Sequence, residues 1–139
     1  MATETYRERR FHDTEDRSFL YYLTGTFARL LFALPFMVFG INHFVQGSAM
    51  AGGVPVPGGV FWVYFIGLCL VAASIAITFN VLRTWAGIAL AALLMTFVLT
   101  MHLPAVLADG MAAMNSVIAL LKDTSLAGAA LYFAGRPHR

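Results

Sequence analysis

The chain has 139 residues, of which 60% are hydrophobic and only 12% are charged. A soluble domain usually carries about 25% charged residues. Half that fraction is too little to form an ordinary water-exposed surface, so a soluble globular domain is excluded. The net charge of +2 at pH 7 is small and lies mostly near the chain ends, which gives no indication of nucleic-acid binding. The apolar residues fall into four long blocks, which predict an all-α fold, an integral membrane four-helix bundle.

Residues 1–20 form a polar segment before the first apolar block. Its arginines alternate with acidic residues, and no apolar core follows at the distance typical of a signal peptide. We therefore expect a cytoplasmic tail that packs little against the rest of the chain.

The membrane domain is expected to comprise residues 21–135. The apolar blocks predict membrane helices at about 22–44, 60–79, 85–107 and 114–134, each close to the roughly 20 residues that cross a bilayer. Glycine and proline between residues 45 and 59 predict a connector, and residues 136–139 form a short C-terminal end.

The positive charges predict the orientation of the helices. Of the nine lysines and arginines, seven lie outside the blocks, and all seven fall on the side that holds both termini. Positively charged residues accumulate on the cytoplasmic side of membrane proteins. Both termini are therefore expected in the cytoplasm.

Three charged residues lie inside the apolar blocks: Arg29, Lys122 and Asp123. Charges within a membrane are costly and often belong to functional sites, so one interpretation is a polar pocket within the bundle. The other is structural: Arg29 pairs with Asp123 and joins the first helix to the fourth, while Lys122 extends toward the outer face. The sequence leaves both open.

A second polar group comprises Asn42, His43 and His102, which are expected near the outer membrane interface. A quinone headgroup needs hydrogen-bond partners, and its redox chemistry needs a proton carrier such as histidine. These residues are therefore candidates for a quinone site, although interfacial histidines at helix ends explain them equally simply. No His-x-x-His or Glu-x-x-His spacing is present, so neither a metal nor a haem is expected.

Together these features resemble the DoxX-like family of small four-helix membrane proteins, over residues 28–135. The matching features are Arg29 at the start of the first helix, the FGINHF stretch of Phe39 to Phe44, the Gly/Pro-rich connector, His102 near the end of an alanine-rich helix, and the Lys122–Asp123 step. The resemblance implies a compact bundle in a bacterial inner membrane. Some relatives are subunits of a thiosulfate:quinone oxidoreductase, and others are linked to redox-stress complexes.

One feature departs from the family pattern. Many relatives carry a glutamate a few residues after a glycine in the second helix, whereas Leu68, Cys69 and Leu70 follow Gly67 here. The resemblance implies a quinone- or redox-linked subunit, but the missing acid favours a non-catalytic accessory or scaffold subunit of a larger membrane complex. A small-solute transporter that acts as an oligomer is a further alternative. The expected partners are the lipid bilayer and other membrane subunits or further copies of the chain, and whether the chain is an enzyme stays open.

Overall fold

The computed structural model describes residues 17–53, 57–112 and 114–135, and this part of the chain is helical without any strand. Four helices are long and apolar enough to cross a membrane, which confirms the predicted all-α four-helix fold. The first comprises a helical segment from Arg17, the π-helical turn η1 (Leu23–Phe27) and α2 (Ala28–Val45), and the second is α4 (Gly59–Thr78). The third comprises α5 (Arg83–Phe97), the π-helical turn η3 (Val98–His102) and α6 (Leu103–Asp109), and the fourth is α7 (Met114–Gly135).

The segments between these helices contain short helical turns. The connector holds α3 (Gly47–Met50) and η2 (Ala51–Gly53), and η4 (Gly110–Ala112) precedes α7. The chain is already helical at Arg17, so the end of the predicted polar tail belongs to the first helix. Residues 1–16 of that tail and the C-terminal end, 136–139, lie outside the described residues.

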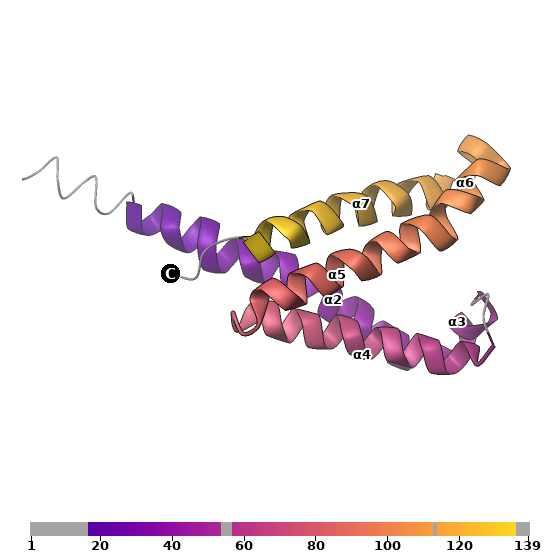
Figure 1. Cartoon of the computed structure of the whole chain (residues 1–139), viewed down its shortest axis with the longest axis horizontal. Helices are drawn as coiled ribbons and strands as arrows, with labels where there is room; N and C mark the ends of the chain where they lie inside the picture. Colours follow the sequence, from indigo (N-terminus) through magenta and orange to yellow (C-terminus); the bar gives the residue numbers. More distant parts are fainter. Residues whose placement is uncertain (1–16, 54–56, 113, 136–139) are drawn as a thin grey trace, which may run out of the picture.

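The helices pack as two pairs, α2 with α4 and α5 with α7, and a smaller contact between α4 and α5 joins the pairs. Figure 1 shows the pairs close together near the turn from α4 to α5 and separated where α3 and α6 lie. We call this second end the connector end. The separation matters because polar side chains of α2, η3 and α7 lie in this part of the bundle.

Small residues bring α2 and α4 close together. A Cβ atom added to Gly40 would lie 2.6 Å from Val71 Cγ2 and 2.8 Å from the carbonyl oxygen of Gly67. Ser74, which is buried, donates a hydrogen bond of 2.8 Å to the carbonyl oxygen of Ala33. Helices in lipid associate through this kind of close approach and interhelical hydrogen bonding, so α2 and α4 form a tight pair.

The pair of α5 and α7 is built in the same way. A Cβ atom added to Gly87 would lie 2.7 Å from the carbonyl oxygen of Ala130. Thr84 Oγ1 donates to the carbonyl oxygen of Ala134 at 3.2 Å. Across the two pairs, the rings of Phe32 and Phe133 stack with centroids 4.9 Å apart. This stack links α2 to α7 far from the connector end. The two helices can therefore diverge from the stack toward the connector end.

Candidate polar pocket between the helix pairs

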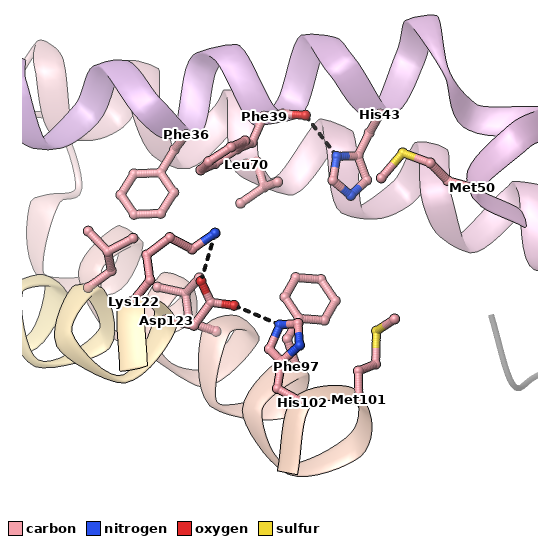
Figure 2. A pocket seen from close by; sticks show the side chains of 12 residues that line it. Phe36, Phe39, His43, Met50, Leu70, Phe97, Met101, His102, Lys122 and Asp123 are labelled. Atoms are coloured by element: carbon pink, nitrogen blue, oxygen red, sulfur yellow. Dashed lines mark hydrogen bonds and ion pairs between the residues drawn. The ribbon is translucent and has the colours of Figure 1, made fainter. Parts of the chain in front are cut away.

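A cavity of about 260 Å³ lies between the helix pairs and brings together four of the six candidate residues, His43, His102, Lys122 and Asp123. Figure 2 shows these side chains directed into one space from opposite walls. The remaining lining is apolar: Phe36, Phe39, Met50, Leu70, Leu94, Phe97, Met101 and Leu126. The two candidate groups that the sequence separates therefore belong to one pocket.

The pocket has a buried base and an exposed mouth. Phe36, Leu70 and Leu94 are almost completely buried. By contrast, Met50 and Met101 are 36% and 41% exposed, and they lie toward the connector end. An apolar molecule in the bilayer can therefore reach the polar groups past flexible methionine side chains, which adapt readily to different shapes.

Asp123 is the buried charge of the pocket and has two partners. Its Oδ2 atom lies 3.2 Å from His102 Nε2, and its Oδ1 atom lies 3.4 Å from Lys122 Nζ. The Lys122 ammonium also lies 4.7 Å from the centre of the Phe39 ring, over which a cation is attracted by the π electrons. A buried carboxylate requires such compensation, and Lys122 provides part of it although its own side chain is 45% exposed.

His43 faces this ion pair from α2. Its Nδ1 atom lies 2.7 Å from the carbonyl oxygen of Phe39, one helical turn earlier. A carbonyl oxygen only accepts, so Nδ1 must carry the hydrogen, and the neutral ring keeps its lone pair on Nε2. Figure 2 shows the ring projecting from α2 with this second nitrogen on the pocket side. The α2 wall therefore offers a hydrogen-bond acceptor opposite the cation of the α7 wall.

His102 is presented by a local distortion of the third membrane helix. Pro104 has no backbone N–H, so the regular helical hydrogen bond to the carbonyl group of Thr100 is impossible. The π-helical turn η3 lies directly before this position and ends at His102. Single π-helical turns interrupt α-helices frequently at functional sites, and this one carries the histidine that contacts Asp123.

The structural interpretation, in which Arg29 pairs with Asp123, is wrong. Both carboxylate oxygens of Asp123 have other partners, and no ion pair within residues 17–53, 57–112 and 114–135 includes Arg29. The reason is depth: Asp123 shares its pocket with Phe36, which follows Arg29 by seven residues, or about 10 Å along the helix. The Arg29 Nε atom is buried without a hydrogen-bond partner, and the residue does not line the pocket.

Asn42 is the other candidate that the structure leaves outside the pocket. Its Oδ1 atom accepts a 2.7 Å hydrogen bond from Gln46 Nε2 on the same helix. Conversely, the aromatic walls of the pocket were not predicted from the sequence. Phe36, Phe39 and His43 recur at the i, i+3, i+7 spacing of one helix face. Leu94, Phe97 and Met101 have the same spacing, and these two patterns were the available signal.

A second hollow differs in character. It lies between α4 and α5, has a volume of about 650 Å³, and is lined by alanines together with Cys69, Leu82, Trp85, Leu90, Leu93 and Thr96. None of its lining residues is charged. The larger space is therefore suited to acyl chains or another helix, whereas the smaller pocket concentrates the groups that can bind or carry a proton.

The smaller pocket combines a cation, a carboxylate and two imidazoles with aromatic walls. Such a site suits a planar ring with polar oxygens, and its histidines can hold or transfer protons. Comparisons of the chain with protein-family models, with curated proteins and with solved structures found no match.

Proposed function

We propose that this chain is a quinone-binding, redox-linked membrane subunit, and that the pocket between the helix pairs holds the quinone headgroup. The observation that carries the proposal is the convergence of His43, His102, Lys122 and Asp123 on one otherwise apolar pocket. The resemblance to DoxX-like proteins of the bacterial inner membrane supports it, because some of those proteins are subunits of a thiosulfate:quinone oxidoreductase.

The apolar lining suits a quinone ring. Pockets for drug-sized ligands span roughly 300–1,000 Å³, so a cavity of about 260 Å³ suits a ring and not a whole lipid. The rings of Phe36, Phe39 and Phe97 provide aromatic surface for contact with a planar headgroup. An isoprenoid tail would then leave past Met50 and Met101 into the bilayer.

The polar lining suits the ring oxygens. Lys122 has three N–H donors, and its pairing with Asp123 Oδ1 leaves capacity to donate to a ring oxygen. His102 and His43 are positioned to hold protons near that ring, and Asp123 orients the His102 imidazole. A bound quinone supplies the redox chemistry, while the residues of the chain bind the ring, limit water access and provide proton-carrying groups.

The Asp123 carboxylate also provides an acid in place of the glutamate that the second membrane helix lacks. The second membrane helix lacks the glutamate of many relatives, and Leu70 lines the base of the pocket. Asp123 on α7 places an acid in the same cavity as the two histidines. The missing glutamate is therefore a weaker argument for a purely accessory role than the sequence suggests.

The proposal is tested by purifying the chain from a bacterial membrane and measuring the quinone that is extracted with it. We expect quinone above the level carried by the co-purifying lipid, and a clear loss in Lys122→Met and His102→Phe. Thr124→Val is the matched control, because the Thr124 hydroxyl is exposed and donates to Leu120 of its own helix. Quinone at the lipid background level, together with a stable membrane partner, would favour the accessory function instead.

A further inference from the structure

We infer that the pocket binds the reduced, hydroxyl-bearing form of the ring more tightly than the carbonyl form, with His43 Nε2 accepting the hydroxyl hydrogen. The inference rests on the proposed function and adds a chemical preference to it. It follows from the hydrogen bond that fixes the tautomer of His43.

The starting point is the Nδ1 atom of His43. Its contact of 2.7 Å with the Phe39 carbonyl oxygen is within the helix and does not depend on a ligand. With Nδ1 protonated, neutral His43 has only a lone pair at Nε2. A quinone carbonyl oxygen is also an acceptor, so it forms no hydrogen bond with that nitrogen. A hydroxyl group donates to the same nitrogen without any change of the protein.

The α7 wall, opposite His43, can bind a hydroxyl oxygen as well as it binds a carbonyl oxygen. The ammonium of Lys122 can donate to the oxygen of a hydroxyl or of a carbonyl, so it does not distinguish the two forms. Asp123 is occupied by Lys122 and by His102 Nε2, and an ionised Asp123 requires that His102 Nε2 donates. His102 Nε2 is then the donor to Asp123, and we assign the selection between the two forms to His43, whose Nε2 atom is on the pocket side.

The size of the effect follows from the cost of an unmet hydrogen bond. A buried acceptor left without a donor weakens binding by roughly fivefold to a hundredfold. His43 is only partly buried, which favours the lower part of this range. We therefore expect the reduced ring to bind roughly tenfold more tightly than the oxidised ring at neutral pH.

The test uses three probes that share one ring: tetramethyl-1,4-benzoquinone, its quinol held reduced without oxygen, and the dimethyl ether of that quinol. Their affinities for the full chain in lipid nanodiscs are measured by calorimetry. The quinol should bind roughly tenfold more tightly than the quinone. The dimethyl ether should show no such advantage, because it has the reduced ring but no hydrogen to donate. Equal affinities, or a tighter quinone, would overturn the inference.

Two variants locate the preference. His43→Phe should weaken quinol binding and bring the two affinities together, whereas Asn42→Leu should preserve the difference, because Asn42 does not line the pocket. A difference that persists in His43→Phe would overturn the assignment to His43. If none of the three probes binds the wild-type chain, the proposed quinone site fails and the inference fails with it.

A measurement on the wild-type chain avoids dependence on folding of the variants. Nitrogen-15 NMR of labelled histidine distinguishes a protonated ring nitrogen from one with a lone pair. We expect His43 to be the Nδ1-protonated tautomer, with an Nε2 signal that shifts on addition of quinol and not on addition of the dimethyl ether. The Nε2-protonated tautomer in the free chain would contradict the inference.

Discussion

His102 Nε2 lies 3.2 Å from Asp123 Oδ2, which joins the π-helical turn of the third membrane helix to the middle of the fourth. Lys122 holds the other carboxylate oxygen at 3.4 Å. The charge of Asp123 is therefore compensated entirely by the α5/η3 and α7 side of the bundle. The α2 wall contributes His43 and aromatic surface across the pocket, so a ligand between the walls does not have to break this ion pair.

The first prediction concerns coupling between His102 and Asp123. In a double-mutant cycle of His102→Phe and Asp123→Leu, the two changes should be non-additive by about 1–2 kcal/mol, the upper range for polar contacts between membrane helices. Unfolding of the purified chain in mixed micelles provides the free energies. The matched cycle of Arg29→Leu with Asp123→Leu should be additive, because these residues lie at different depths. If the Arg29–Asp123 cycle showed coupling and the His102–Asp123 cycle showed none, the geometry of the site would be contradicted.

The second prediction concerns the close contact of α2 with α4. Gly40→Ala should lower the free energy of unfolding by about 1–3 kcal/mol, the usual cost of overpacking, because the new methyl group would meet Val71 and the Gly67 backbone. Gly128→Ala is the control, since a Cβ atom there has no neighbour within 4 Å. It should cause no loss, and alanine's helix propensity favours a gain of up to about 1 kcal/mol. Equal losses would show that close packing does not hold the pair together.

The helices themselves were predictable from the sequence because lipid imposes a simple requirement. A long uncharged block must satisfy its backbone internally, and a helix does so. The α4 helix begins at Gly59 and ends at Thr78, each one residue earlier than the block predicted. The start of the first helix was misplaced, because the polar residues near Arg17 show no apolar signal although the helix already includes them.

The site was only partly predictable, because it depends on how the helices pair. Lys122, Asp123 and both histidines stood out as polar residues in apolar surroundings. Their convergence depends on α2 and α7 diverging toward the connector end, which hydropathy does not report. The Arg29–Asp123 pair does not form, because Asp123 shares a pocket with Phe36, which lies seven residues after Arg29 on α2.

The third prediction concerns orientation. Reporter fusions at Gly53 and at Gly110 should be external, and a fusion at Arg139 should be internal, because all seven lysines and arginines outside the apolar blocks of the sequence are expected on the side of the termini. Alkaline phosphatase and a fluorescent protein, which are active on opposite sides of the membrane, provide the two readouts. A cytoplasmic signal from the Gly110 fusion would contradict the orientation.

The most direct test of the quinone site is photo-crosslinking of an azido-quinone to the chain in membranes, followed by mass spectrometry of the labelled peptides. We expect label on α2 between Phe36 and His43, and on residues 94–102 or 122–126, and we expect unlabelled quinone to compete for these positions. Label confined to the hollow between α4 and α5, around Cys69 and Trp85, would contradict it. So would label that unlabelled quinone does not displace.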